Sequence, residues 1–232
     1  MGRRKGKIWF AVLALATFFF LPQITESFDL SVGGKAGLTF PRYIGADYNA
    51  WMGDRLFEAD FKFDWSAGVF LTIGVLPFLA IQPEILVSNL GGFSENPLLS
   101  HWKEYIQGID VPILIKYRTR SDRSVIFNLF VGPDIFFKYR PIRTTFTNLI
   151  GNPIPFTPPF EPFDDSLIRV TTFGFCAGLG LEAPLRSIFL TFDGRYNLSL
   201  VPHFTDAGPY RKWYQQSFQV MFGAGYVLIG KR

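Results

Sequence analysis

Apolar and polar residues alternate one by one over long stretches of the chain from residue 28 onward. The segment 188–200 is the most regular, because Leu190 and Phe192 alternate with Thr191 and Asp193 and the pattern continues to Leu200. An alternation of period two is typical of a β-strand with one apolar and one polar face. The chain is therefore expected to be built from strands rather than helices.

The same pattern recurs often enough to predict eight strands. They are expected at residues 28–40, 61–73, 79–89, 103–117, 125–138, 168–182, 188–200 and 217–229. Each is longer than the strand of about 5–6 residues that is common in globular proteins.

The connections between these strands alternate between long and short. Residues 41–60, 90–102, 139–166 and 201–214 form long connections, and residues 74–78, 118–124 and 183–187 form short ones. Outer-membrane barrels have long extracellular loops and short periplasmic turns, and an even strand number returns both termini to the periplasm. The observed order fits that arrangement, with the long connections outside.

The composition of the two strand faces separates a membrane barrel from a soluble barrel of the lipocalin type, which has the same number of strands. One face is almost continuously Phe, Leu, Ile, Val and Trp, whereas the other mixes Gly, Ser, Thr and Asn with charges of both signs. Lipid-facing positions require the first kind of face, and a narrow packed interior accepts the second. We therefore expect an all-β protein, an eight-stranded antiparallel up-and-down transmembrane β-barrel.

The start of the chain carries a separate signal. Four basic residues between Arg3 and Lys7 precede an apolar run from Ile8 to Leu21, and small residues follow up to Ser27. This order predicts a signal peptide over residues 1–27 and a barrel domain over residues 28–232, with an uncleaved membrane anchor as the alternative. Most of the net charge of +4 lies in that segment, so nucleic acid is not expected as a partner.

Charged residues on the polar face are the most informative candidates for a site. We expect the following side chains to share one narrow lumen: Lys35, Lys62, Asp64, Glu84, Glu104, Asp110, Lys116, Asp134, Lys138, Glu182, Asp193 and Arg195. Buried charges are costly unless they are paired, so a network of ion pairs that fills the interior is expected. A selective aqueous path is the alternative, although eight strands leave little room for one.

Signals for catalysis or for a cofactor are weak. His101 and His203 fall in expected outer loops, and Ser199 and Asp206 lie close to His203 in sequence, a grouping that also arises by chance. Metal-ligand spacing is absent, and the glycines near Cys176, the only cysteine, lie inside an expected strand rather than before a helix. We predict no enzyme activity, no catalytic residue, no cofactor and no metal.

The long connection at residues 139–166 combines several prolines with phenylalanines. Proline cannot donate to a strand ladder, so this segment is not expected to form a strand. It is interpreted either as a flap that binds a partner or ligand, or as a loop whose Phe side chains pack on the barrel mouth. Outer-membrane lipid is the expected partner of the wall, and protein or ligand contacts are expected through the outer loops.

Four strand segments, IQPEILVS (81–88), IDVPILIKY (109–117), VGPDIFFKY (131–139) and FCAGLGLE (175–182), resemble patterns at matching places of one family. This is the porin-family outer-membrane β-barrel domain, which includes PorT-like proteins. The resemblance implies a bacterial outer-membrane location and carries over no catalytic residue. The first functional hypothesis is a barrel with a structural or interaction role; the alternatives are a small-solute transport barrel and a barrel enzyme.

Overall fold

The computed structural model describes residues 28–53, 58–96, 100–119, 125–141, 143–148, 168–205 and 212–230. The expected signal peptide, most of the connection at 139–166 and Asp206 lie outside these ranges. In chain order the elements are β1 (Asp29–Ile44), α2 (Ala46–Gly53), β2 (Glu58–Asp60), β3 (Asp64–Leu76), β4 (Leu79–Leu90), β5 (Phe93–Asn96), β6 (Ser100–Arg118), β7 (Ile126–Lys138), β8 (Arg143–Asn148), β9 (Thr171–Leu185), β10 (Ile188–Ser199) and β11 (Tyr214–Ile229).

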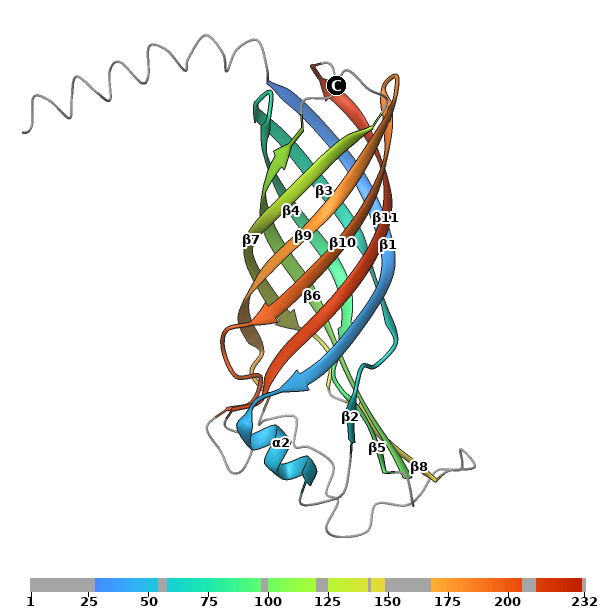
Figure 1. The fold of residues 1–232 in the computed structure, drawn as a ribbon, viewed down its shortest axis with the longest axis vertical. Helices are drawn as coiled ribbons and strands as arrows, with labels where there is room; N and C mark the ends of the chain where they lie inside the picture. Colours follow the sequence, from blue (N-terminus) through green and yellow to red (C-terminus); the bar gives the residue numbers. More distant parts are fainter. Residues whose placement is uncertain are drawn as a thin grey trace, which may run out of the picture.

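Eight of these described strands close into an antiparallel ring in the order β1, β3, β4, β6, β7, β9, β10 and β11 (Figure 1). Each strand pairs with the next one in this order, and β11 pairs back onto β1 over a register that runs from Leu30 opposite Ile229 to Ile44 opposite Tyr214. The ring confirms the predicted eight-stranded up-and-down barrel. A closed ring leaves no unpaired strand edge, which is what a sheet inside a bilayer requires.

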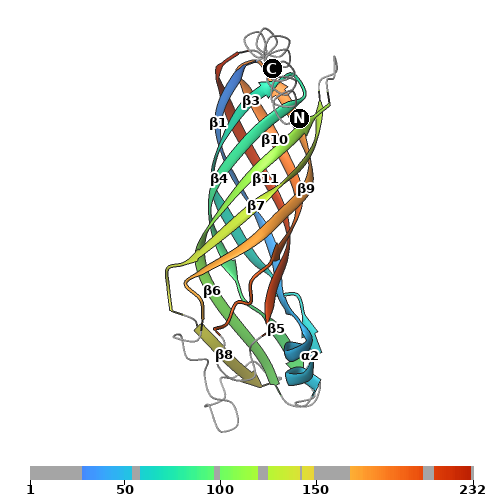
Figure 2. The same cartoon turned by 90° about the vertical axis from the view of Figure 1, so that its left-hand side faces the viewer.

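The described parts of the long connections lie at one end of the barrel and contain structure of their own. There β6 continues beyond the ring and pairs with β5 on one side and β8 on the other, while β2 pairs with β5 (Figures 1 and 2). We call this sheet, formed by Glu58–Asp60, Phe93–Asn96, the first residues of β6 and Arg143–Asn148, the outer extension. The expectation that 139–166 contains no strand is wrong for 143–148, because the prolines lie outside these residues and leave their N–H groups free to pair.

The other end is formed by short turns, as the sequence predicts. Pro77 and Phe78 connect β3 to β4, and Arg186 and Ser187 connect β9 to β10. Arg186 adopts a positive φ of 62°, which is common at tight hairpin turns. Strand β9 therefore reaches Leu185, three residues beyond the expected end, because the turn needs only two residues.

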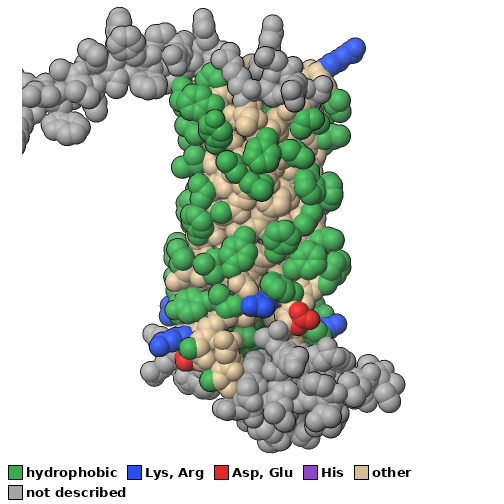
Figure 3. Space-filling view, in the orientation of Figure 1, with side chains coloured by type: hydrophobic (Ala, Val, Ile, Leu, Met, Phe, Trp, Pro, Cys, Tyr) green, Lys and Arg blue, Asp and Glu red, His purple; other side chains and the backbone are tan. Residues whose placement is uncertain are grey.

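The outer surface of the ring is an apolar band. The exposed fraction is above one half for Phe63, Val69, Ile85 and Phe222, and it is 49% for Trp65. Figure 3 shows apolar side chains over the face of the cylinder in view and charged side chains only near its two ends. No helix in the described ranges is long and apolar enough to cross a membrane.

Candidate functional site in the barrel interior

A four-residue network, formed by Lys35, Glu84, Asp193 and Arg195, fills the middle of the lumen. Lys35 Nζ donates to Glu84 Oε1 at 2.8 Å and to Asp193 Oδ2 at 2.6 Å. Arg195 donates to Glu84 Oε2 at 2.8 Å and to Asp193 Oδ2 at 2.9 Å. These side chains are at most 1% exposed. We call this set the central network.

Strand geometry explains how these four residues meet. Asp193 and Arg195 are two positions apart on β10 and so share its inner face, whereas Lys35 and Glu84 come from β1 and β4. None of β1, β4 and β10 is a ring neighbour of another. The contacts of Lys35 and Arg195 with Glu84 therefore cross the lumen, and the side chains of opposite walls close it.

A second group continues the network toward β9. Lys116 Nζ donates to Glu182 Oε1 at 2.9 Å and to Gln82 Oε1 at 3.0 Å. The Gln82 amide in turn donates to Glu84 Oε1 at 2.6 Å. The amide thereby connects the Lys116–Glu182 pair to the central network, so both groups belong to one polar interior.

A separate group of buried charges, Lys62, Asp64 and Glu104, lies toward the outer extension. Lys62 Nζ forms an ion pair with Asp64 at 2.9 Å and donates to the backbone oxygens of Leu90 and Glu104. The Glu104 side chain is fully buried at this level. These contacts hold the wall strands β3, β4 and β6 together where the ring gives way to the extension.

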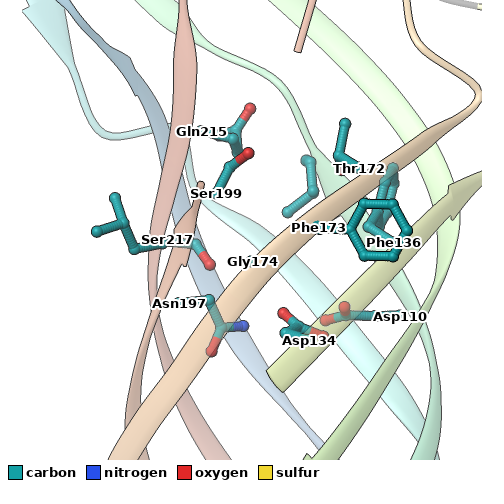
Figure 4. Close-up of a pocket in the computed structure, with 12 residues that line it drawn as sticks. Asp110, Asp134, Phe136, Thr172, Phe173, Gly174, Asn197, Ser199, Gln215 and Ser217 are labelled. Atoms are coloured by element: carbon teal, nitrogen blue, oxygen red, sulfur yellow. The ribbon is translucent and has the colours of Figure 1, made fainter. Parts of the chain in front are cut away.

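Asp110 and Asp134 lie side by side on β6 and β7 and line a small cavity of about 30 Å³ (Figure 4). The two carboxyl groups lie close together in Figure 4, and like charges at such a distance repel each other. Thr172, Asn197 and Ser217 are further polar residues of this cavity. Of the twelve predicted interior charges, eleven are buried, and Lys138 at the end of β7 is only partly buried.

One interior ion pair was missed by sequence reasoning. Arg118 donates through both terminal nitrogens to Asp29, at 2.9 and 3.3 Å, near the short-turn end of the barrel. Arg118 was placed in the connection 118–124, although it has the same parity as Glu104, Asp110 and Lys116 on β6. If the alternation on this strand is extended by one residue, from Tyr117 to Arg118, it predicts that Arg118 faces the interior.

The interior also contains aromatic side chains that the alternation did not assign to it. Phe130 is buried, and the cations of Arg195 and Lys116 lie 5.4 and 5.9 Å from its ring centroid. Phe130 pairs in register with Gly178 on β9, and a Cβ at Gly178 would lie 2.6 Å from the ring. Glycine at 178 therefore leaves the space that the ring occupies.

An aromatic group closes the outer mouth above these charges. Tyr43, Tyr48, His203, Phe204 and Trp213 are each at most 1% exposed, and we call them the rim cluster. The ring of Trp213 packs edge-on against Tyr48 at 4.7 Å and against Phe204 at 5.1 Å. Tyr48 comes from helix α2, so the helix is anchored to the barrel through this cluster.

His203 belongs to the connection between β10 and β11, as predicted, but it is buried rather than exposed. Its ring lies 6.1 Å from those of Tyr43 and Phe136. Burial, with a contribution from the Lys138 ammonium, lowers the pKa of the His203 imidazole to about 4. The nearby Ser199 hydroxyl donates to the backbone oxygen of Val201. His101 lies in strand β6 rather than in a loop.

Metal binding finds no support in the interior. Among the described residues, no three His, Cys, Asp or Glu side chains are grouped so that they could hold a metal ion. Cys176 is buried in a small apolar cluster with Leu114 and Phe130. The arrangement fills the lumen of an apolar cylinder with polar and paired charged side chains.

Comparison with known proteins agrees with that architecture. The family model described as outer membrane protein beta-barrel domain matches residues 23–205. The chain belongs to this family. The barrel is thus an outer-membrane protein.

Solved structures of outer-membrane barrels resemble this barrel in fold. Neisserial surface protein A (NspA) is 10% identical, with a TM-score of 0.47 over 85% of this chain and 96% of that chain. OprG from Pseudomonas aeruginosa is 13% identical, with a TM-score of 0.47 over 88% and 97%. The outer membrane protease OmpT from Escherichia coli is 11% identical, with a TM-score of 0.40 over 87% and 96%. A search of proteins with curated descriptions gave no match.

Proposed function

We propose that this outer-membrane barrel is a closed protein with a structural or interaction role, and that its outer extension makes the contacts. The observation that carries the proposal is the central network, in which side chains from opposite walls meet across the lumen with at most 1% exposure. Passage of a solute would require these pairs to separate and leave charges unpaired in a low-dielectric interior. Such separation is strongly unfavourable.

Current measurement across a planar bilayer tests the closed lumen. We expect the full-length barrel to give no steady current above that of the empty bilayer. A charge-neutral double variant, Glu84→Ala with Arg195→Ala, removes two of the side chains that cross the lumen and serves as the control that should conduct. A steady ion current through the unaltered protein would instead favour the small-solute transport barrel.

We also infer that catalysis is not the main role. His203 is the residue on which an enzyme hypothesis would depend, and it is packed among aromatic rings instead of facing a substrate cleft. Screening peptide and lipid hydrolysis, with His203→Ala as the control, tests this point. Hydrolysis that is lost in the control variant would favour the barrel enzyme.

Two further parts of the proposal concern the ends of the molecule. We infer that residues 1–27 act as a cleaved signal peptide, because a basic start precedes an apolar run of signal-peptide length. We also infer that the outer extension contacts a protein or ligand partner, since it projects beyond the lipid-facing band (Figure 2). Sequencing the N-terminus of the protein recovered from outer membranes tests the first inference.

A further inference from the structure

A pocket of about 590 Å³ lies on the outside of the wall, where β6 leaves the ring and enters the outer extension. Its volume falls within the range of roughly 300–1,000 Å³ that is usual for small-molecule sites. The lining residues come from β6, from the connection after β7 and from β8: Tyr105, Gln107, Arg140, Pro141, Arg143 and Thr145. No acidic residue lines the pocket in the part of the chain that the structure describes.

The outward-facing side chains of β6 show where along the barrel axis the pocket lies. Ile115, Ile113 and Ile109 are exposed to lipid at 51, 42 and 37%. The next outward positions are Gln107 and Tyr105, so the apolar surface ends between Ile109 and the pocket. The pocket therefore lies at the boundary between hydrocarbon and headgroups.

The same boundary can be followed on the adjacent strand. Phe137 on β7 pairs with Ile109 and is 40% exposed, and the backbone N–H of Tyr139 donates to the Gln107 oxygen at 3.2 Å. Tyrosine at this position is typical of a membrane interface, where an apolar ring carries a polar group. Lipid chains that lie against Ile109 and Phe137 would place their headgroup at the pocket.

The polar groups of the pocket suit an anion. Arg140 Nη1 donates to Gln107 Oε1 at 2.9 Å, which holds the guanidinium at the pocket and leaves its other N–H groups available. Arg143 lies opposite Tyr105 in the ladder between β6 and β8. Guanidinium groups recognise phosphate with paired hydrogen bonds, and two of them in a pocket without a carboxylate favour a doubly charged group.

We propose that this pocket binds the phosphate group of an outer-leaflet glycolipid, with Arg140 and Arg143 as its ligands. A membrane lipid is favoured over a soluble anion because the apolar surface of Ile109 and Phe137 continues directly from the pocket. The proposal depends on the long connections facing outward and does not depend on whether the lumen conducts. Its failure and that of the closed-lumen proposal can therefore be told apart.

Binding of diphosphorylated lipid A to the folded full-length barrel in detergent micelles, followed by native mass spectrometry, tests the proposal. We expect the double variant Arg140→Gln with Arg143→Gln to raise the dissociation constant about tenfold, since two charge-assisted contacts are lost. Arg186→Gln is the matched control, because Arg186 is an exposed arginine at the opposite end. It should leave the dissociation constant unchanged. Heat-modifiable gel mobility confirms that each variant is folded.

Two comparisons identify the group and its source. The same glycolipid without its phosphates should bind the unaltered protein about tenfold more weakly, and the double variant should not distinguish the two lipids. Equal binding of both lipids to the unaltered protein would overturn the phosphate assignment. Displacement of the lipid by inorganic phosphate or a soluble sulfated sugar at equal concentration would overturn the assignment to a membrane lipid.

Discussion

The central network and the rim cluster fill the same lumen by different means. The central network uses two cations and two carboxylates that meet across the barrel at 2.6–2.9 Å, and each charge has an opposite charge beside it. The rim cluster uses aromatic rings whose centroids lie 4.7–6.5 Å apart, and it contains one titratable imidazole. Polar pairing fills the lumen at mid-barrel, and aromatic packing fills it at the mouth.

This difference predicts how each region responds to change. Loss of one member of the central network leaves a buried charge unpaired, and the ring strands that carry the network cannot move apart separately. Loss of a rim side chain leaves a cavity beneath α2 and the β10–β11 connection, which can detach without opening the ring. The central network should therefore control the stability of the whole barrel, and the rim cluster should control local opening.

The largest effect is expected from Glu84→Gln. This change leaves Lys35 and Arg195 with one carboxylate between them, and breaking a buried pair costs about 3–5 kcal/mol. Urea unfolding of the barrel in lipid vesicles, followed by tryptophan fluorescence, measures the loss in free energy of unfolding.

A double variant distinguishes charge balance from simple packing. Glu84→Gln with Lys35→Met restores one cation to one carboxylate, so it should recover a large part of the stability that Glu84→Gln removes. A double variant that is as unstable as the sum of its single changes would show that neutrality is not what the central network provides.

The next effect is expected at the rim, from Trp213→Ala. Truncating a fully buried tryptophan costs about 3–5 kcal/mol in a typical core. Here we expect that cost to appear as faster hydrogen exchange and proteolysis of α2 and of residues 200–205, with the urea midpoint of the barrel nearly unchanged. A shift of the midpoint as large as that of Glu84→Gln would mean that the two regions unfold as one unit.

A smaller effect is expected from pH, through His203. Its pKa in the folded protein, about 4, is below the value of about 6.5 for an unperturbed histidine, so the opened state binds more protons between these two pH values. The contribution of His203 to rim closure is therefore complete above about pH 6.5 and is lost as the pH falls toward 4.

Between pH 7 and pH 5 this loss amounts to about 2 kcal/mol. Hydrogen exchange of the rim, corrected for the intrinsic effect of pH, should show the matching increase in opening. His203→Gln cannot titrate, and its rim should open equally at both pH values. The same acid response in this variant would assign the effect to another group.

The smallest effect is expected from Asp29→Asn at the short-turn end. The Asp29 side chain keeps 11% exposure and has Arg118 as its ion-pair partner among the described residues, so water can replace part of the lost interaction. We expect a loss of about 1 kcal/mol in the same urea experiment. A loss equal to that of Glu84→Gln would mean that burial depth does not separate the central network from the terminal pair.

The sequence by itself determined the eight strands of the ring and the direction that their side chains face. Alternation of period two is a local property, so Phe192 and Asp193 could be assigned to opposite faces without knowledge of the partner strands. The membrane class followed as well, because only lipid tolerates a continuous apolar outer face. The lengths of the connections also predicted which end of the barrel carries the long loops, because connection length is likewise a local property of the sequence.

Tertiary structure alone decided which interior charges meet. Lys35 and Glu84 are 49 residues apart, and Lys35 and Asp193 are 158 apart, on strands that are not neighbours in the ring. Barrel closure and strand tilt set the height of each side chain in the lumen, and the sequence pattern contains neither. The burial of His203 also depends on long-range packing, because aromatic rings from three segments surround the imidazole. Strand β8 forms for a similar reason, since β6 supplies the ladder with which it pairs.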